Sequence, residues 1–397
     1  MYEKKRNFSI FEISPQQQPN LTPNLTQKMS NATPSQRLYS LDALRGFDMF
    51  WIMGGEDFFH ELAKATNHPF AIWIATQLSH VAWNGFRFYD LIFPMFLFIS
   101  GVSTPYSVGR EIEKKVENRT ILLRIIKRGL ILVLLGIIYN NGLQFKELSH
   151  IRFPSVLGRI GLAYMFACII YLYARPRFQY VWFGGILIGY WLILKFNAAP
   201  GFATGDLTMA GNFASWFDRT VLPGRLHLTI HDPEGLFSTL PAICTGLLGV
   251  FVGDFLKNSP IEKTRKAASL ALAGIICLII GGSWDMFFPI NKNLWTSSFM
   301  LYAGGCSILL LAIFYYIIDV LDYKSWAFFF TIIGMNSILI YLSDKFIDWY
   351  FTAENLFRWF GQLFNERYYE LAIIACFVLV KWLFLLFMYR KKLFLRV

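Results

Sequence analysis

The chain has 397 residues, of which 55% are apolar, 18% aromatic and only 16% charged. Globular domains carry about 25% charged residues, and the mean hydropathy here is +0.43. This composition excludes a soluble enzyme, a disordered protein, a coiled coil and a secreted disulfide scaffold. The abundant Phe, Tyr and Trp suit a protein that faces lipid and anchors at both membrane interfaces. We therefore expect an all-α polytopic membrane protein.

The formal net charge of +11 does not indicate a nucleic-acid-binding protein. Such binding needs a continuous basic face, whereas Lys and Arg here stand in short stretches between apolar runs, as membrane topology produces. The five cysteines occur singly inside apolar runs, without a CxxC or Cys/His cluster. We expect buried thiols, no disulfide framework and no metal site.

Residues 1–36 are polar and begin with the basic Lys4-Lys5-Arg6. They are rich in Gln, Asn, Thr, Ser and Pro, and they lack the apolar core of a secretory signal peptide. This pattern predicts a disordered cytoplasmic tail, followed by one transmembrane domain over residues 37–397.

The rest of the chain contains about ten apolar stretches of roughly twenty residues, the length that crosses the hydrocarbon core. The first two are the least apolar and hold the most polar residues. The expected spans lie near 40–59, 89–108, 121–140, 155–174, 179–197, 236–256, 267–284, 297–320, 326–349 and 369–390.

The positive-inside rule places both termini in the cytoplasm. With that orientation the inner tails and loops contain 24 Lys and Arg residues and the outer loops contain 9. All six histidines then fall in outer loops or at outer helix ends. Histidine-based proton chemistry would act at the outer side, while basic inner loops could hold an anionic donor.

The first expected span is loaded with charge, although each charged side chain costs about 2.5–3.5 kcal/mol at the bilayer centre on insertion scales. Such residues should face a polar cavity or a partner. Asp42 and Arg45 are three apart and could pair on one helix face, or simply anchor the helix at the inner interface. Glu56 and Asp57 stand near the outer end, facing either water or a cavity.

His80 precedes the second span, and Asn84 and Asp90 follow it. A neutral imidazole can accept a proton from an amine or hydroxyl, a carboxylate can fix its tautomer, and an amide can donate to a developing oxyanion. His80, Asp90 and Glu56 are thus the minimum set for acyl transfer. The competing interpretation is a solvated loop histidine.

Further polar residues gather on the outer side. The stretch Asp232-Pro-Glu-Gly precedes one span, Asn291-Lys-Asn293 opens another, and Asn336 interrupts the ninth. Arg159 could hold an anionic group or snorkel to the interface. The candidate acceptor-binding residues are Asn84, Asp57, Arg159, Glu234, Asn293 and Asn336.

The densest basic cluster stands on the inner side, and it either sets topology and contacts lipid or binds phosphates. No P-loop or GxGxxG is present, which disfavours an ATP-driven pump. The candidate donor-binding residues are Arg45, Arg124, Lys127 and Arg128.

Six stretches taken together resemble the heparan-alpha-glucosaminide N-acetyltransferase family of membrane acyltransferases, in its bacterial-type form. They run in order through nearly the whole chain after the tail, which makes the resemblance specific. They are LDALRGF at 41–47, SHVAWNGFRFYDLIFPMFLFISG at 79–101, RFPSVLGRIGLAY at 152–164, DPEGLFSTLPAICTGLLGVFVG at 232–253, FPINKNLW at 288–295 and GMNSILIY at 334–341.

The resemblance implies a ten-helix acyltransferase domain in the plasma (inner) membrane that uses cytosolic acetyl-CoA to acetylate an amino sugar or glycan on the other side. It also implies a homodimer and a catalytic role for His80. Where the lysosomal enzyme has a site Asn, this chain has Glu56, whose carboxylate could act as a base or bind an ammonium group. The alternative function is a transporter or flippase for a glycan or small metabolite, although no two-half repeat is evident.

Overall fold

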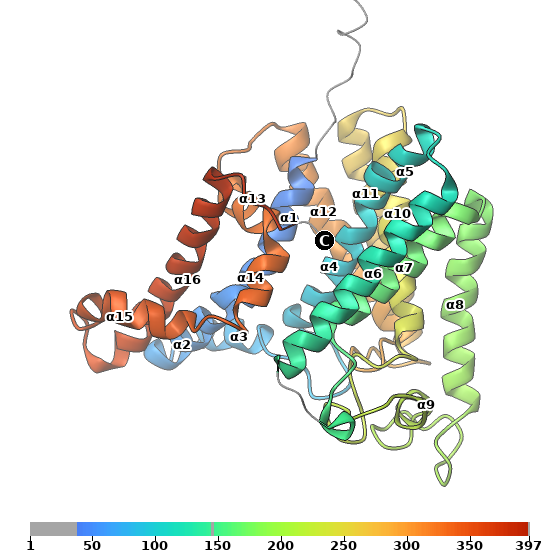
Figure 1. Ribbon diagram of the computed structural model, residues 1–397, viewed down its shortest axis with the longest axis horizontal. Helices are drawn as coiled ribbons and strands as arrows, with labels where there is room; N and C mark the ends of the chain where they lie inside the picture. The colour runs from blue at the N-terminus through green and yellow to red at the C-terminus, as the bar shows by residue number, and fades with distance from the viewer. Residues whose placement is uncertain (1–37, 144–146, 396–397) are drawn as a thin grey trace, which may run out of the picture. The chain divides into compact units, whose positions relative to one another are not determined.

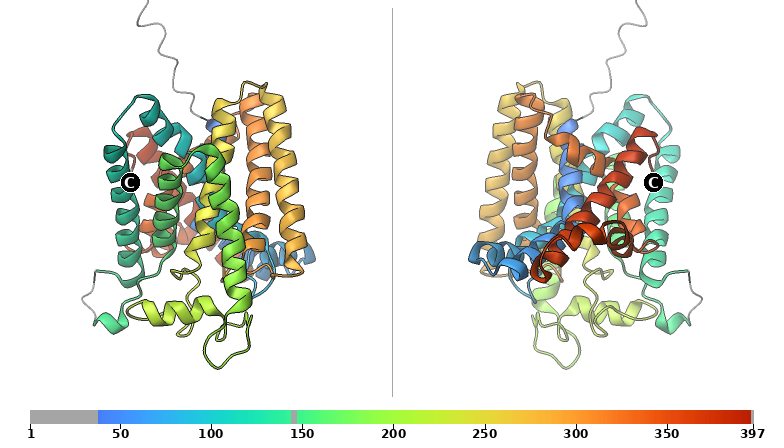
Figure 2. Two further views of the ribbon diagram at one scale, coloured as in Figure 1. Left: turned by 90° about the vertical axis from the view of Figure 1, so that its right-hand side faces the viewer. Right: turned by 90° about the vertical axis from the view of Figure 1, so that its left-hand side faces the viewer.

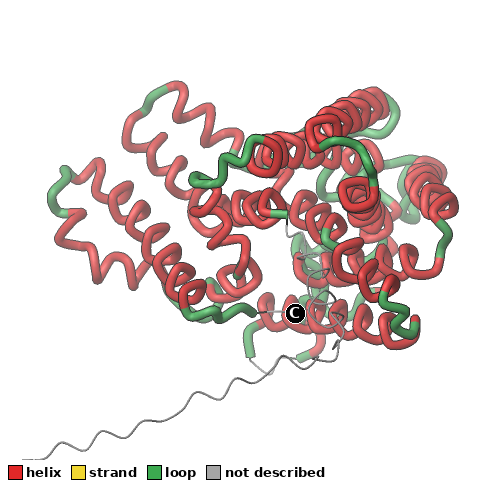
Figure 3. The backbone as a smooth tube through the Cα atoms, turned by 90° about the horizontal axis from the view of Figure 1, so that it is seen from above, coloured by secondary structure: helices red, strands yellow, loops and turns green. Residues whose placement is uncertain are grey.

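The computed structural model describes residues 38–143 and 147–395, and every regular element within those ranges is a helix (Figure 1, Figure 3). The expected tail at 1–36 lies outside them. Short 3₁₀ and π segments carry the label η. The first elements are α1 (Tyr39–Phe50), η1 (Trp51–Gly55), α2 (Glu56–Thr66), α3 (Pro69–Gln77), η2 (Phe88–Leu91), α4 (Ile92–Val102), α5 (Thr104–Glu113), α6 (Asn118–Asn141), η3 (Leu148–His150) and α7 (Val156–Tyr173). The later ones are α8 (Pro176–Phe196), α9 (Phe213–Val221), α10 (Thr239–Asn258), α11 (Lys263–Asp285), α12 (Ser297–Tyr315), η4 (Tyr316–Val320), α13 (Ala327–Met335), α14 (Ser337–Ser343), α15 (Trp349–Gly361) and α16 (Glu366–Arg390).

Within the described residues, seven helical segments are long and apolar enough to cross a membrane. They correspond to seven of the ten expected spans and confirm a polytopic helical membrane protein. The seven are Phe88–Glu113, Val156–Tyr173, Pro176–Phe196, Thr239–Asn258, Lys263–Asp285, Ser297–Val320 and Glu366–Arg390.

The other three expected spans are present as helix that is interrupted or charged. The span near 40–59 is divided by the π segment η1, and the span near 326–349 breaks at Asn336 between α13 and α14. The span near 121–140 lies in the continuous 24-residue α6, whose first half is basic. The number of ten spans and the cytoplasmic placement of both termini therefore stay predictions.

Helix α10 lies at the centre of the long helices, packed against α4, α7, α8 and α12. Figure 2 shows these helices running side by side along one direction. All three glycines of α10 are buried, and so is most of its length, whereas α8 and α11 leave most of theirs exposed. Exposed apolar faces of that kind are what lipid covers.

Glycine lets α1 and α13 approach closely. A Cβ atom on Gly46 would lie 1.7 Å from the Phe330 carbonyl oxygen, and one on Gly334 would lie 2.0 Å from the Asp42 carbonyl oxygen. Small residues at such crossings are the usual means of packing helices in a membrane, where apolar burial supplies little driving force. The motifs around Arg45 and Asn336 therefore meet across one helix pair.

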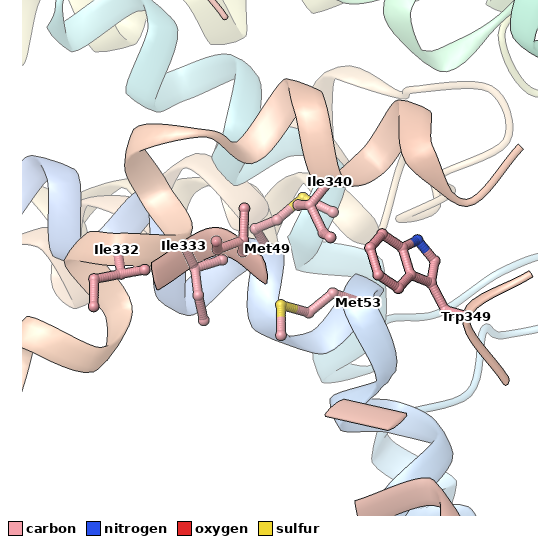
Figure 4. Close-up of a cluster of buried hydrophobic side chains, with 7 residues drawn as sticks. Met49, Met53, Ile332, Ile333, Ile340 and Trp349 are labelled. Atoms are coloured by element: carbon pink, nitrogen blue, oxygen red, sulfur yellow. The ribbon is translucent and has the colours of Figure 1, made fainter. Parts of the chain in front are cut away.

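A buried apolar cluster fixes the position of η1. Met49 and Met53 pack against Ile332, Ile333, Ile340 and Trp349 (Figure 4), and Leu385 of α16 completes the cluster. Helices α13, α14, α15 and α16 thus all contact the segment that leads into Glu56. Close packing of this kind holds a side chain more firmly than a surface loop would.

Candidate functional site

The centre of the candidate site is a hydrogen bond between His80 and Asp90. His80 Nδ1 lies 2.8 Å from Asp90 Oδ1, with Asp90 fully buried and about half of the His80 side chain exposed. The second carboxylate oxygen of Asp90 accepts from the backbone N–H of Arg87 at 3.1 Å. The loop and the first turn of η2 therefore hold the carboxylate in place, and the carboxylate orients the imidazole.

Lys292 brings a positive charge to the same imidazole from a loop 212 residues further along the chain. Its Nζ lies 3.0 Å from Nδ1 and 3.2 Å from Nε2 of His80, and 3.6 Å from Asp90 Oδ1. Only 16% of the Lys292 side chain is exposed. Burial lowers the pKa of Lys292, against the opposing charges of Asp90, Glu234 and Glu56.

Asn84 ties the two loops together. Its Oδ1 accepts a hydrogen bond of 3.0 Å from Asn291 Nδ2, and Gly85 N donates to the Ile290 carbonyl at 2.8 Å. Asn291 Oδ1 also accepts from Leu294 N at 2.8 Å, which fixes the turn into α12. The residue predicted to donate to an oxyanion thus anchors the loop that carries Lys292.

Glu56 reaches the site through the π segment. Gly54 has a φ of 131°, a conformation that L side chains rarely adopt, and this bend redirects the chain into α2. The Glu56 carboxylate interacts with the Tyr89 hydroxyl and with His80. The Tyr89 ring lies against the imidazole, with a centroid separation of 4.8 Å.

A buried lysine supports the π segment. Lys381 of α16 donates to the Met53 carbonyl at 3.1 Å and forms an ion pair of 2.8 Å with Asp344. A backbone carbonyl inside a membrane protein needs such a partner. Asp57, predicted to bind the acceptor, is exposed beside this group and lies within electrostatic reach of Lys381.

His80, Tyr89 and Lys292 line a cavity of about 210 Å³. Glu234 also reaches this cavity, so one of the predicted acceptor-binding residues faces the imidazole. The remaining walls are mostly apolar and come from Met49, Ile52, Ile92, Phe93, Phe96, Val156, Leu157, Ile160, Ser337, Ile338 and Tyr341. We call this space the histidine cavity.

A second cavity of about 330 Å³ adjoins the first, and we call it the arginine cavity. Arg45 and Arg128, two of the predicted donor-binding residues, line it together with Ser100, Ser103 and Tyr164. Five residues line both cavities: Phe96, Leu157, Ile160, Ser337 and Ile338.

One face of α4 runs along both cavities. Phe93 and Phe96 line the histidine cavity, Phe96 and Ser100 line the arginine cavity, and Ser103, which directly follows α4, also lines the arginine cavity. Steps of three and four residues keep side chains on a single helix face. The two cavities therefore follow one direction, from the imidazole at one end to the two guanidinium groups at the other.

The other two predicted donor-binding residues lie elsewhere on α6. Arg124 is exposed and forms an ion pair of 2.6 Å with Glu111, and Lys127 is exposed. Arg128 instead turns toward the cavity, where it donates to the Tyr164 hydroxyl at 3.2 Å. The structure thus separates a basic cluster that is continuous in the sequence.

The remaining predicted acceptor-binding residues line neither cavity. Arg159 is 2% exposed, donates to the Gly235 carbonyl at 2.9 Å and lies 5.1 Å from the Trp295 ring. Asn336 holds the C-terminal segment, donating to the Leu393 carbonyl at 3.0 Å. Asn293 is half-buried next to Lys292.

A carboxylate network supports Glu234. Arg152 forms a bidentate pair with Asp232, at 2.8 and 2.7 Å, and also contacts Glu234. Burial alone would favour a neutral Asp232, but the bonds and charge of Arg152 outweigh it and lower the pKa of Asp232. Arg152 thus fixes Glu234 at the wall of the histidine cavity.

Sequence reasoning missed Lys292 and Tyr89. The sequence motif Asn291-Lys-Asn293 predicted a role in acceptor binding for Asn293 and none for Lys292. A lysine in an outer loop that otherwise lacks bases was the available signal. Tyr89 gave no signal of its own, since aromatic residues are frequent throughout the chain.

The fold and the site define a class of protein, a multi-pass helical membrane protein with a histidine–carboxylate pair in a two-part cavity. No protein-family profile matches the chain. The chain is similar to heparan-alpha-glucosaminide N-acetyltransferase from Mus musculus, with 28% identity over 377 residues, and from Homo sapiens, with 28% over 380 residues. The match covers 80% of this chain and 56% of each relative, so the chain spans about half the length of these curated relatives. The resemblance predicted from the motifs is confirmed at the level of the family.

Proposed function

We propose that the chain is a transmembrane acetyltransferase that moves an acetyl group from cytosolic acetyl-CoA to an amino sugar or glycan on the outer side of the membrane. The supporting observation is the pair of adjoining cavities, which share five lining residues between His80 and the guanidinium groups of Arg45 and Arg128. This arrangement suits a long donor whose anionic head binds the guanidinium groups and whose acyl end reaches the imidazole.

The donor's phosphates would contact Arg45 and Arg128, since guanidinium groups bind phosphate oxygens well. The pantetheine arm would follow the shared face of α4 past Ser100 and then Ser103, which directly follows the helix. The thioester carbonyl would then reach His80. A thioester is already activated, so the protein needs mainly to position it and to manage one proton.

His80 would manage that proton. With its Nδ1–H donated to Asp90, Nε2 carries the free lone pair that a general base needs. The acceptor nitrogen attacks the carbonyl carbon, its proton passes to Nε2, and the carbon–sulfur bond breaks. The sulfur leaves as thiolate and takes a proton, giving the N-acetylated sugar and CoA.

A two-step route is the alternative within the same site. There Nε2 attacks the thioester, an acetyl-imidazole forms as CoA leaves, and the acceptor amine then takes the acetyl group. Glu56 and Glu234 would bind the acceptor as its ammonium form or take its proton. Trapping an acetyl group on His80 in the absence of acceptor would distinguish this route from direct transfer.

The setting of the enzyme is part of the proposal. We infer a plasma (inner) membrane location in contact with lipid and, from the family resemblance, a homodimer. The seven candidate spans support a multi-pass membrane protein. Crosslinking in native membranes would report the dimer without purification.

The test is acetyl-CoA turnover by purified protein in nanodiscs with glucosamine as acceptor. We expect CoA release to require the sugar and to fall about 10²- to 10⁴-fold in His80→Ala, the usual contribution of a general base. His68→Ala is the matched control, because His68 caps α3 through a 3.3 Å bond to Phe70 N instead of facing either cavity.

Two results would overturn the proposal. If the folded protein neither binds nor hydrolyses acetyl-CoA, acetyl-CoA is not its donor. If His80→Ala keeps full activity, His80 is not a catalytic residue. Sugar uptake into liposomes that proceeds without acetyl-CoA would indicate a transporter instead.

A further inference from the structure

Two charged groups of opposite sign contact the imidazole of His80. Asp90 Oδ1 lies 2.8 Å from Nδ1, and Lys292 Nζ lies 3.0 Å from Nδ1 and 3.2 Å from Nε2. The ammonium group can only donate hydrogen bonds, and the carboxylate can only accept them. One tautomer suits the carboxylate, with the hydrogen on Nδ1 donated to Asp90, and the ammonium group beside the ring then disfavours a second proton on Nε2.

The other charged and titratable groups near this pair are few. Glu56 of α2 and Tyr89 of η2 face the imidazole, and Glu234 lines the same cavity from the loop before α10. Arg87 donates through Nη1 to the His80 carbonyl at 3.2 Å, so its charge lies on the backbone side of the residue. Lys292 is therefore the cation that contacts the ring nitrogens within the described residues.

The loop geometry shows that this contact is built into the fold. Asn84 and Asn291 join the two loops directly, and the Asn291 side chain caps the turn that follows Lys292. Leu294 and Trp295 are almost completely buried behind it. These contacts hold the backbone of the loop in place, so the position of Lys292 is set by the fold and not by the conformation of its side chain alone.

We propose that Lys292 is a positioning residue that keeps His80 neutral and Nδ1-protonated, so that Nε2 is available as the base or nucleophile. A carboxylate alone favours the imidazolium form, and a neighbouring cation disfavours it. Asp90 thus orients the ring through Nδ1, and the ammonium group of Lys292 lies beside the same ring. This assignment rests on the proposed role of His80, but the protonation of His80 can be measured separately from turnover.

The experiment follows the reaction of His80 with diethylpyrocarbonate, which modifies neutral imidazole, as a function of pH. The modified peptide is quantified by mass spectrometry in the full chain in detergent, and His80 is accessible because half of its side chain is exposed. Wild type is compared with Lys292→Met, Lys292→Arg and the control Lys64→Met, whose side chain is 71% exposed on α2.

In Lys292→Met we expect the midpoint of modification to move upward by about one pH unit or more, the effect of removing a charge within 4–6 Å. Lys292→Arg keeps the charge and should retain the wild-type midpoint, as should Lys64→Met. An unchanged midpoint in a folded Lys292→Met protein would overturn the proposal. Should that variant fail to fold, Lys292→Gln removes the same charge while keeping a donor, and it decides the question equally.

Turnover supplies a second and separable measurement. The acidic limb of the kcat/KM profile should move upward by the same amount in Lys292→Met. A shifted modification midpoint in a protein that never turns over acetyl-CoA would support Lys292 and refute the acetyltransferase proposal. Turnover of acetyl-CoA with the same acidic limb in wild type and Lys292→Met would support the acetyltransferase proposal and refute the role of Lys292.

Discussion

At the scale of single residues, this protein places opposed charges around polar groups that it has buried. His80 lies between Asp90 and Lys292, and Glu234 is held by Arg152. A buried charge without a partner is expensive, whereas a pair keeps both groups in place. Burial also affects two titratable groups in α9 and in the loop before α10, which gives a prediction about pH and stability.

Asp218 and His231 are two buried groups, and burial displaces the pKa of each toward the ordinary range of the other. Burial raises the pKa of Asp218 from 3.8 to about 6 and lowers that of His231 from 6.5 to about 4. His231 stabilises the fold above pH 6.5, and that contribution is lost as the pH falls to 4. Asp218 stabilises it below pH 3.8, and that contribution is lost as the pH rises through 6.

Between about pH 6 and 4 the two effects should cancel in the wild type, because the unfolded chain gains a proton on the histidine while the folded chain gains one on the aspartate. Asp218→Asn removes the titration of the aspartate and leaves that of His231. The free energy of unfolding should then fall by up to about 1.4 kcal/mol for each pH unit by which the pH is lowered from 6 to 4. The apparent Tm in detergent, measured from pH 7 down to pH 5, checks this.

The amide of Asp218→Asn can still accept the backbone bonds of 2.9 and 3.1 Å from Leu236 and Phe237, so the comparison isolates the charge. Asp348→Asn is the control, since asparagine caps α15 as well as aspartate does. Parallel pH curves for wild type and Asp218→Asn would refute the prediction.

Residue patterns predicted part of the site. The chemistry of acyl transfer grouped His80 with Asp90, because a carboxylate can fix the tautomer of an imidazole, and the structure places the two groups 2.8 Å apart. Lys292 could not be found in this way, because its contact with His80 joins two loops that are adjacent only after folding. Arg124 and Arg128 are four residues apart and share one face of α6, so their separation depends on the tertiary partner that each meets along the helix, Glu111 for Arg124 and Tyr164 for Arg128.

At the scale of elements, glycines decide which helices meet. On α10, a Cβ atom added to Gly249 would lie 2.1 Å from the Phe98 carbonyl oxygen of α4. On α8, one added to Gly184 would have nothing within 4 Å. Since α4 lines both cavities, the first contact bears on the site as well as on stability.

We expect Gly249→Ala to lower the stability by at least about 1–3 kcal/mol, the usual range for overpacking, and to reduce acetyl transfer. Gly184→Ala should leave the stability unchanged or raise it slightly, because alanine favours helix. Thermal unfolding of both variants in the same detergent measures the difference. Equal Tm values would show that α4 and α10 are not in the close contact described.

Helical elements were predictable where apolar length alone defines them, as in α11 and α16. The interrupted spans were not predictable in detail, because a π segment depends on tertiary support. Lys381 donates a hydrogen bond to the Met53 carbonyl, although the two residues are 328 positions apart in the sequence. The residues around Gly54 therefore do not predict this partner. The break at Asn336 is likewise supported by the distant Leu393.

At the scale of the whole molecule, the proposed reaction needs the histidine cavity and the arginine cavity to open toward opposite sides of the membrane. The distribution of Lys and Arg predicts that arrangement, and it requires the interrupted or charged elements to cross as well. Helix α6 can do so with its basic first half at the inner interface, where lysine and arginine contact lipid headgroups. The α13–α14 pair can do so because its break is hydrogen-bonded to protein.

Single cysteines on either side of these elements test the crossing. Lys114 and Leu143 are exposed and flank α6, and Asp322 and Lys345 are exposed and flank α13 and α14. With a membrane-impermeant maleimide, we expect Lys114→Cys and Asp322→Cys to react only from the cytoplasmic side. Leu143→Cys and Lys345→Cys should react only from the opposite side.

The wild type sets the background, because its five cysteines are free and three of them are buried. Thr204→Cys, in the loop between α8 and α9, and Ser259→Cys, directly after α10, form the calibrating pair, since α10 lies between them in the chain and has the length and composition of a span. If both members of either test pair react from one side, that element does not cross the membrane and the count of ten fails. Labelling from opposite sides for both pairs would place the basic end of α6 on the cytoplasmic side, where the donor's phosphates must enter.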